Sequence, residues 1–497
     1  MMMPLSSTLT LLFIAGMFSP LAAQDASAPA NTGTVIIDTD SAVVKDYWGA
    51  GVQWDPSDQF DYTQEQWNYI DQRVAFIQPG FIRCCITGAA YSTGFNASGN
   101  PIYQWDSPLM KRLYHILDFC QAHHVRVILG DWWPTFGLTW DDPRWDRLLG
   151  DLFNHLVKTK GYTCIAAVNK YNEPSGTYDD FLAWKKGQLS IKATLEKKGL
   201  ADQVVVAAPD SWEPWIGWTA GHLGGTVGLY ESHLYPKDSI IESGKAESIA
   251  RGFREEVNAL DPNGLNVPYL LGEAGTGDWP GKGVDSNTHI RDFIYGVYMA
   301  DYFVQSGHGG LHGMSAWMLD DSMHNQDHTL QIKGVTTGDP KVDDNLKEWG
   351  MWNTMGTSMG KPDEEKPRPW YTAWALASHC FPRGATVLST GPAPFDGTRV
   401  GASMVRHGNQ ADLGIIVVND SDSARVVHLT VPKATGTATL QQYDYFDQDR
   451  PVDADGIPTI KQTLKDVDLN AGIDLNLPTR GAIFLTTTSG GSPVTLK

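Results

Sequence analysis

Short apolar runs with the length of β-strands alternate along the chain with longer segments whose apolar residues recur at helical spacing. Trp67, Ile70, Val74 and Ile77, for example, share one face of a helix. This alternation predicts a parallel sheet wound with helices. Eight such runs between residues 47 and 388 predict a TIM (β/α)8 barrel. The runs are residues 48–54, 81–86, 125–131, 164–168, 204–208, 227–233, 267–271 and 314–319.

Helix boundaries are marked by capping residues. Thr63-Gln64-Glu65-Gln66 has the pattern of a capping box at the start of the first barrel helix, and Pro79-Gly80 ends that helix. Ser107-Pro108 predicts the start of the next one, because proline is favoured in the first helical turn. These signals support the division of the barrel region into separate strand and helix units.

Outside the barrel region, both ends of the chain contain strands without helices. Residues 34–38 and 42–44 precede the barrel, and short strand runs separated by turns follow it. This pattern predicts a C-terminal β-sandwich completed by an N-terminal strand. The predicted divisions are 34–46 for the N-terminal strands, 47–388 for the barrel, 389–488 for the sandwich and 489–497 for a tail. The later runs are residues 402–405, 413–418, 426–429, 438–440 and 482–485.

The first residues have the pattern of an export signal. Residues 11–18 form a short apolar run, and Leu21-Ala22-Ala23 offers small residues for cleavage, although no Lys or Arg precedes the run. We therefore expect a signal peptide over residues 1–23, a spacer over 24–33 and a secreted or periplasmic mature protein. No other run is long enough to predict a membrane span.

Composition narrows the possible partners. Of the 497 residues, 42% are hydrophobic and 18 are Trp, which is typical of a globular protein. The formal charge of −19 argues against nucleic acid as a partner, because phosphates require a basic surface. The five Cys residues are expected to be buried thiols rather than disulfides. The sequence does not indicate an oligomeric state.

Two glutamates end strand-like runs one hundred positions apart. Glu173 follows the fourth run, and Glu273 follows the seventh. The carboxyl ends of barrel strands meet at one mouth, where barrel enzymes carry out catalysis. A pair of carboxyl groups about 5 Å apart can hydrolyse a glycosidic bond with retention, one acting as nucleophile and the other as acid and then base.

Tyr171-Asn172-Glu173-Pro174 and Leu271-Gly272-Glu273, placed after the fourth and seventh strands, resemble the catalytic motifs of glycoside hydrolase clan A. With a barrel and a side β-sandwich, the chain is most similar to families 30, 39, 51 and 79. The resemblance implies that Glu173 is the acid/base and Glu273 the nucleophile. It implies no cofactor and no metal.

The resemblance also implies substrate-binding positions, each matched by a residue of this chain. They are Arg83 on the second strand, Asn172 before the acid, His233 and Tyr235 after the sixth strand, and Trp317 after the eighth. Asp131 departs from the His that some clan members carry after the third strand. Aromatic rings and carboxylates are the groups that bind sugars, so we also expect substrate contacts from Trp54, Asp131 and Trp132. Further candidates in the mouth loops are Trp133, Trp212, Trp215, Trp218 and Trp279.

Together these features predict an exported retaining glycoside hydrolase acting on a neutral-sugar polysaccharide or glycoconjugate, with exo action. One alternative is an endo-acting glycanase of xylanase, glucanase or galactanase type. A different class is a catalytically inactive carbohydrate-binding protein. Asp320-Asp321 could bind hydroxyls or calcium, or lie in a solvated loop. Four histidines follow one another closely, but glycines interrupt the segment, so we do not expect a metal site there: His308, His312, His324 and His328.

Overall fold

The computed structural model describes residues 32–56, 62–174, 176–278, 287–323, 346–357, 360–488 and 490–497. The predicted signal peptide, Trp279, His324 and His328 lie outside the described residues. No helix within these ranges is both long and apolar enough to cross a membrane.

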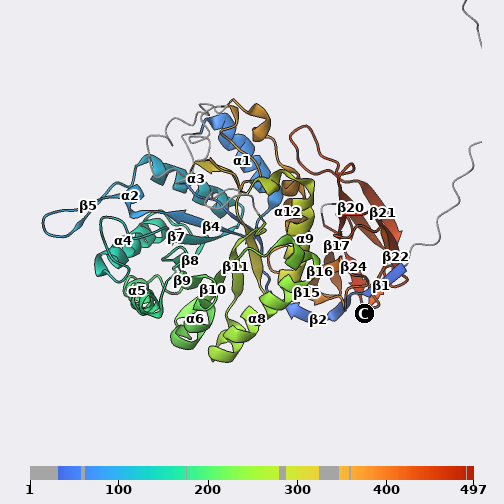
Figure 1. Ribbon diagram of the computed structural model, residues 1–497, viewed down its shortest axis with the longest axis horizontal. Helices are drawn as coiled ribbons and strands as arrows, with labels where there is room; N and C mark the ends of the chain where they lie inside the picture. Colours follow the sequence, from blue (N-terminus) through green and yellow to red (C-terminus); the bar gives the residue numbers. More distant parts are fainter. Residues whose placement is uncertain are drawn as a thin grey trace, which may run out of the picture.

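Eight parallel strands form a closed barrel, as predicted, and helices surround it (Figure 1). Pairing of β12 with β3, in the register Gly313 to Gly49, joins the last strand to the first. The barrel strands are, in order, β3 (Gly49–Gln53), β4 (Phe81–Ile86), β7 (Arg126–Asp131), β8 (Ile165–Asn169), β9 (Val205–Ser211), β10 (Val227–Leu234), β11 (Tyr269–Ala274) and β12 (Gly313–Ala316).

The two helices whose capping residues mark their starts begin where the sequence predicts. The Thr63 side chain accepts a hydrogen bond from the Gln66 amide, and the Gln66 side chain accepts one from Thr63, which completes the capping box of α1. Ser107 caps α3 in the same way at the Met110 amide. The main helices are α1 (Gln64–Ile77), α3 (Pro108–Ala122), α4 (Pro143–Asn154), α5 (Tyr178–Lys197), α6 (Trp215–Leu223), α8 (Lys245–Leu260), α9 (Phe293–His308) and α12 (Pro369–Cys380).

Shorter elements decorate the connections. A hairpin of β5 and β6 projects from the barrel beyond β4 (Figure 1). A π-helical turn, η1, continues directly from α4. These elements are α2 (Gly88–Tyr91), β5 (Ser92–Phe95), β6 (Pro101–Tyr103), η1 (His155–Thr159), α7 (Asp238–Glu242), η2 (Gly264–Asn266), η3 (Thr288–Arg291), β13 (Ser322–Met323), β14 (Leu346–Lys347) and η5 (Pro362–Glu365).

Apolar side chains fill the lower barrel interior. Phe81, Ile128, Leu229 and Leu270, from four different strands, belong to one buried cluster. Gly51 permits this packing, because a Cβ there would lie 2.5 Å from the Phe81 ring. The interior is therefore closed below the mouth, as in other barrels of this type.

Two sheets form the sandwich. The larger follows the order β2-β15-β16-β17-β23-β20-β21, with β19 and β24 attached, and the smaller is β1-β18-β22. Both N-terminal strands join these sheets, since β1 pairs with β18 and β2 with β15. The strands are β1 (Thr32–Ile36), β2 (Asp38–Val44), β15 (Thr386–Ser389), β16 (Thr398–His407), β17 (Gln410–Asn419), β18 (Arg425–Thr430), β19 (Ala434–Thr435), β20 (Ala438–Phe446), β21 (Gln462–Val467), β22 (Ile473–Leu477), β23 (Gly481–Thr486) and β24 (Val494–Leu496).

The larger sheet is apolar on both faces. Ile415 and Val417 pack in the cluster shared with the smaller sheet, whereas Ile416 and Val418 belong to the main barrel cluster. Neighbouring strand residues point to opposite faces. One face therefore covers the smaller sheet, and the other covers α9 and α12 of the barrel.

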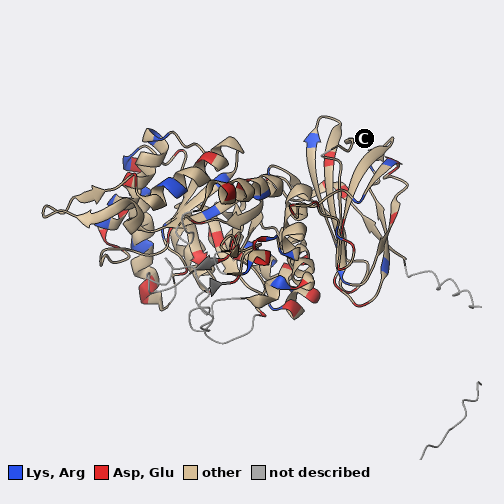
Figure 2. Cartoon of the chain, turned by 90° about the horizontal axis from the view of Figure 1, so that it is seen from above, with Lys and Arg blue, Asp and Glu red and all other residues tan. Residues whose placement is uncertain are grey.

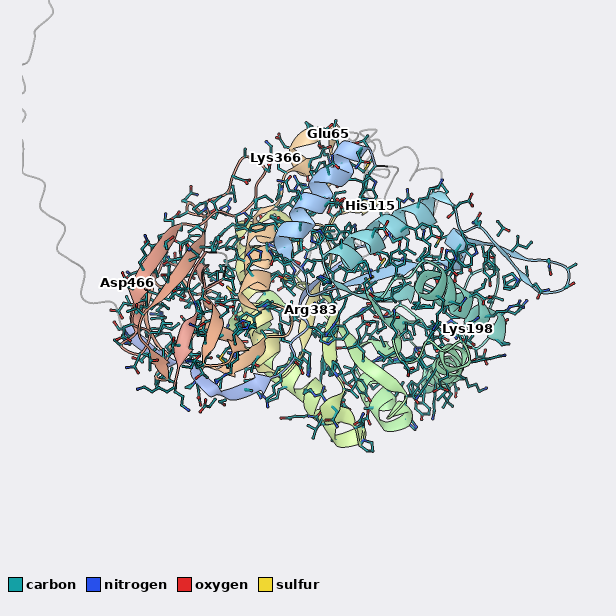
Figure 3. All side chains as sticks on the ribbon, turned by 180° about the vertical axis from the view of Figure 1, so that it is seen from behind. Glu65, His115, Lys198, Lys366, Arg383 and Asp466 are labelled. Atoms are coloured by element: carbon teal, nitrogen blue, oxygen red, sulfur yellow. The ribbon has the colours of Figure 1, made fainter. Side chains whose placement is uncertain are left out.

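The sequence analysis predicts β1, β2, β16, β17, β18, β20 and β23 of the sandwich. It does not predict β15, β19, β21, β22 and β24. All five cysteines are free thiols, as expected, and Cys164 alone among them is partly exposed. Acidic and basic side chains are interspersed over the barrel and the sandwich (Figure 2). Asp466, on the edge strand β21, lies at the sandwich end of the molecule, and Lys198, directly after α5, lies on the barrel (Figure 3).

Candidate active site

The two glutamates reach the barrel mouth from different kinds of backbone. Glu273 lies within β11 and is almost fully buried. Glu173 lies beyond the end of β8, in the loop that leads to α5, and its φ of 45° is left-handed. Its amide donates a 3.0 Å hydrogen bond to the Asp210 carbonyl, which ties this loop to β9. The strained conformation holds Glu173 over the mouth.

Arg83, in the middle of β4, is fully buried and connects the mouth residues. Its Nη1 donates to Glu273 Oε1 at 2.8 Å and to Gln53 Oε1 at 2.9 Å. Its Nη2 donates to Asn172 Oδ1 at 2.7 Å and to Asp210 Oδ2 at 2.8 Å. Its Nε lies 3.2 Å from Glu231 Oε1. One guanidinium therefore contacts three buried carboxyl groups: Asp210, Glu231 and Glu273.

His233 and Tyr235 bring the two candidate catalytic groups together from β10 and the loop after it. His233 Nδ1 lies 2.8 Å from Glu173 Oε1 and 3.4 Å from Glu273 Oε2. His233 Nε2 lies 2.7 Å from Asp210 Oδ1. Tyr235 donates a 2.9 Å hydrogen bond to Glu273 Oε2. Glu273 is therefore fixed through both of its oxygens.

Burial and neighbouring charges shift the titration of these groups. Burial raises the pKa of Glu273, and His233 and Arg83 oppose that shift. Burial also raises the pKa of Glu231, to about 8, and the charge of Asp210 adds to the effect. Burial alone would lower the pKa of His233, but Glu273 and Asp210 outweigh it and raise that pKa well above its ordinary value. Both ring nitrogens of His233 therefore face carboxyl oxygens, an arrangement that favours its protonated form.

An aromatic wall borders the carboxylates on the side of Glu273. Trp132, Trp317 and Trp349 are buried in one cluster, and Tyr235 packs against it. The Trp132 and Trp317 rings meet edge to face at 6.2 Å, and the Arg83 guanidinium lies 5.6 Å from the Trp132 ring centre. Such rings can stack on the apolar face of a sugar.

The predicted set thus divides in two. The structure brings Arg83, Asn172, Glu173, His233, Tyr235 and Glu273 into one hydrogen-bonded network, with Trp132 and Trp317 beside it. Trp54 instead packs edge to face against Phe119 of α3, inside the main core. Asp131 is buried and accepts a hydrogen bond from Trp145 Nε1 of α4, and burial raises its pKa to about 8.

The other mouth tryptophans also differ from one another. Trp133 and Trp212 are exposed. Trp215 and Trp218 belong to α6, where Trp215 is buried and both rings pack against Phe181 of α5. The second pair therefore supports helix packing.

Asp320 and Asp321 are buried, which corrects the interpretation of a solvated loop. Asp320 accepts hydrogen bonds from Tyr62 Oη and the Thr354 amide. Asp321 binds Arg368 and the Trp349 and Gly350 amides. These partners occupy the oxygens that hydroxyls or calcium would need, so both residues stabilise the loop after β12.

Two groups of side chains have the spacing of metal ligands: Glu173, His233 and Glu273, and Asp210, Glu231 and His233, each with candidate atoms within 4.8 Å of one another. In both groups the atoms already bond to Arg83, to His233 or to each other. A cationic guanidinium stands where a metal would provide charge, so the arrangement fits an ion-pair network. His308 and His312 belong to neither group.

Sequence analysis missed Gln53, Asp210, Glu231 and Trp349. Asp210 and Glu231 carried a usable signal, because each is an acid inside or directly after an apolar strand run. An acid at such a position needs a buried partner. Trp349 follows a segment without strand periodicity, and no signal in the sequence connects it with the mouth.

No family model and no curated protein matches the chain. Solved structures do resemble it. A GH39 enzyme from Xanthomonas axonopodis pv. citri is 15% identical with a TM-score of 0.60, covering 93% of this chain and 99% of that one. The catalytic domain of GH30 xylanase C from Talaromyces cellulolyticus is 13% identical with a TM-score of 0.61, covering 91% and 99%. An alpha-L-arabinofuranosidase from Thermotoga maritima is 11% identical with a TM-score of 0.60, covering 92% and 99%. The chain therefore has the fold of these glycoside hydrolases, as predicted.

Proposed function

We propose that the protein is a retaining glycoside hydrolase that acts on a neutral-sugar polysaccharide or glycoconjugate. Glu173 is the acid/base, and Glu273 is the nucleophile. The observation that carries this proposal is their spacing: oxygens of the two carboxyl groups lie within 4.8 Å of each other. Retention needs carboxyl groups about 5–5.5 Å apart, whereas inversion needs about 6.5–9.5 Å to admit a water molecule.

The surroundings of the two residues suit these roles. Arg83 and Tyr235 each hold one oxygen of Glu273, which fixes its approach to the anomeric carbon. Glu273 attacks that carbon while Glu173 protonates the leaving oxygen. Water then attacks the glycosyl-enzyme, and Glu173 accepts its proton.

Asn172 supports the same reaction. Its Oδ1 accepts a hydrogen bond from Arg83, so its Nδ2 group is oriented as a donor. We assign this donor to a sugar hydroxyl next to the reacting carbon. A hydrogen bond there that strengthens in the transition state would increase the rate.

Exposed aromatic residues favour a sugar chain as the leaving group. Among the described residues, the exposed Trp, Tyr and Phe side chains follow three adjacent barrel strands, β7, β8 and β9. Glu173 lies after the middle one, so these rings flank the group that contacts the leaving oxygen. The buried aromatic cluster of Trp132, Trp317 and Trp349, in which Trp132 lies next to Trp133, suits a single enclosed sugar. Both features favour exo action on a longer chain. The exposed rings are Trp133 (54% exposed), Phe136 (40%), Tyr178 (39%) and Trp212 (43%).

We also propose export through residues 1–23. Expression of the full chain in a bacterial host should yield a mature protein that begins after Ala23. Intact-mass analysis of the processed protein would check this, and a mature protein that retained residues 1–23 would contradict it.

The test of the function compares the wild type with Glu273→Ala on aryl glycosides of both anomers and on a polysaccharide panel, with proton NMR of the released sugar. Retention, lost in the variant and partly restored by azide, would support the proposal. Inversion would overturn the role of Glu273. Mid-chain cleavage of polymers would favour the endo-acting alternative, and sugar binding without hydrolysis would favour a binding protein.

A further inference from the structure

We propose that Lys170 is a positioning residue that fixes the acid/base Glu173 relative to the leaving-group side of the mouth. The proposal rests on the acid/base role of Glu173. Lys170 directly follows β8, at the start of the acid/base segment (residues 170–174), and its side chain is 0% exposed. Its amine lies against α4 and α5, so it acts on the reaction only through the segment that it holds.

The Lys170 amine joins three separate parts of the barrel. Its Nζ donates a 2.7 Å hydrogen bond to Asp146 Oδ1 of α4 and a 3.1 Å hydrogen bond to the carbonyl of Trp140, which lies in the loop after β7. A third contact, 3.4 Å long, reaches the carbonyl of Gly187 in α5. A lysine ammonium has three donors, and each of them has an acceptor here.

The local sequence leaves room for this contact at Gly187. A Cβ there would lie 2.2 Å from the Tyr171 hydroxyl, 2.7 Å from the Trp140 carbonyl oxygen and 2.9 Å from Lys170 Nζ. The Tyr171 hydroxyl also donates to the Trp140 carbonyl. Two consecutive residues of the acid/base segment therefore bind one carbonyl, and α5 approaches closely enough to enclose them.

Glu173 needs this support because its own side chain is 37% exposed, so packing around the carboxyl group does not fix it. Its position depends on the backbone that carries it. On the mouth side, Asn172 accepts from Arg83, and the Glu173 amide donates to the Asp210 carbonyl. Lys170 holds the same segment from the outer side, between the helices.

The acceptor of this contact belongs to the leaving-group side. The loop after β7 (residues 132–142) carries Trp133 and Phe136, two of the exposed rings assigned above to the leaving sugar chain. Trp140 lies in the same loop, and its carbonyl accepts from both Lys170 and Tyr171. One shared contact therefore connects the group that protonates the leaving oxygen with the rings that contact the leaving sugar.

The chemistry makes this connection important. A general acid works only within about 2.6–3.2 Å of the oxygen that it protonates. Misplacement of a catalytic group by about 1 Å can lower a rate about 10²-fold. Without the Lys170 amine, the acid/base segment loses its outer hold, and Glu173 shifts relative to the leaving oxygen. Leaving groups that need a proton then depart slowly, whereas those that depart as stable anions are less affected.

The first test is Lys170→Met, which keeps the length of the side chain but removes its donors. With aryl glycosides of graded leaving-group basicity, we expect kcat/KM for phenyl glycosides to fall about 10²-fold. The loss for 2,4-dinitrophenyl glycosides should be at least about tenfold smaller, because these leaving groups need little protonation. Equal losses for the two substrates would overturn the positioning role.

Lys198→Met is the matched control. Lys198 also pairs with an aspartate of α4, since its Nζ lies 2.6 Å from Asp151 Oδ1, but this ion pair is partly exposed and does not involve the loop after β7. We expect the ratio of the two kcat/KM values to stay that of the wild type. The same selective loss in Lys198→Met would show a general effect of ion pairs on α4 and would contradict the role of Lys170.

A second variant separates positioning from stability. Lys170→Met alone leaves Asp146 buried without its cation, which destabilises the fold. The double variant Lys170→Met/Asp146→Leu removes both charges, and an apolar pair can be as stable as the buried ion pair that it replaces. We expect its urea midpoint to return toward that of the wild type while the selective loss of kcat/KM persists, because the Trp140 carbonyl still lacks its donor. Recovery of wild-type kcat/KM with phenyl glycosides would show that Lys170 serves stability alone and would overturn the proposal.

The second step of the reaction gives an independent readout. Water needs Glu173 as a base when it attacks the glycosyl-enzyme, whereas azide does not. With 2,4-dinitrophenyl glycosides, azide should therefore raise kcat more in Lys170→Met than in the wild type and give a glycosyl azide of retained configuration. An equal response of the two proteins would overturn the role of Lys170. A wild type without hydrolytic activity would instead overturn the proposed function, and this role with it.

Discussion

The barrel mouth and the sandwich are both buried, but they are held together by opposite kinds of interaction. In the mouth, Arg83 and His233 are surrounded by the carboxylates of Asp210, Glu231 and Glu273. In the sandwich, apolar side chains such as Ile415 and Leu429 fill the space between the sheets. Desolvated charges stabilise a fold weakly unless each keeps its partner, whereas buried apolar area stabilises it directly. The mouth is therefore organised for chemistry, and the sandwich supplies stability.

The largest loss of stability is expected when the cation at the centre of the mouth is removed. Arg83→Met removes the cation that contacts the buried carboxyl groups of Asp210 and Glu273, so we expect a loss of about 3–5 kcal/mol in the free energy of unfolding. Urea denaturation would measure it. Arg144→Met, which removes an exposed ion pair to Asp142, should change stability by less than about 1 kcal/mol. Equal effects of the two substitutions would contradict the role given to Arg83.

Apolar truncation in the sandwich should weaken the fold without changing the chemistry. Ile415→Ala and Ile416→Ala create cavities on opposite faces of one sheet, and each should lower the free energy of unfolding by about 2–5 kcal/mol. At a temperature where both variants are folded, kcat/KM should stay within about twofold of the wild type. A large loss of kcat/KM in a folded variant would show that the sandwich shapes the mouth.

The buried acid Asp131 should make the stability of the barrel depend on pH, whereas an exposed acid in the sandwich should not. Its folded-state pKa is about 8, against about 3.9 in an unfolded chain. Between these values the folded protein holds a proton that the unfolded chain releases, so the contribution to stability is present below about pH 4 and is lost as pH rises toward 8. Asp131→Asn should lose less stability between pH 5 and pH 8 than the wild type in urea titrations. Asp466→Asn, at an exposed site in the sandwich, should behave like the wild type. A wild-type pH dependence in Asp131→Asn would contradict this assignment.

The smallest effect on stability is expected at the exposed rings of the mouth. Trp133→Ala should change the free energy of unfolding by less than about 0.5 kcal/mol, but it should weaken binding of oligosaccharides about tenfold. Titration calorimetry with oligosaccharides of increasing length would measure the loss. Leu265→Ala, which removes an exposed apolar side chain before β11, should not affect binding. Unchanged oligosaccharide binding by Trp133→Ala would remove this ring from the substrate surface.

Periodicity and strand ends were enough to predict the barrel and the two glutamates. A strand that is buried on both faces of a parallel sheet has an almost continuous apolar sequence. A polar residue at its carboxyl end faces the mouth of the barrel. Glu173 and Glu273 follow this rule. The edge strand β21 carried no such signal: in Gln462–Val467 most side chains are exposed, so the run is not apolar.

Side-chain direction was the harder problem. Trp54 directly follows β3, yet its ring packs outward against α3. A shift of one residue along a strand reverses the side on which a residue lies, so residues next to strand ends were easily misassigned. The contacts of Asp210 and Glu231 could not be predicted from the local sequence, because their partner Arg83 lies on a strand far away in the sequence. Only the register of the closed barrel brings them together.

Pairing of the N-terminal strands with late segments of the chain has a consequence for biosynthesis. β1 pairs with β18, and β2 pairs with β15, so the two N-terminal strands of a growing chain cannot pair until residues 386–430 have left the ribosome. Until the larger sheet has formed, the surface of α9 and α12 against which it packs stays exposed to solvent. The sandwich therefore forms after the barrel residues have been synthesised, and a chaperone that shields this surface should increase the yield of the protein.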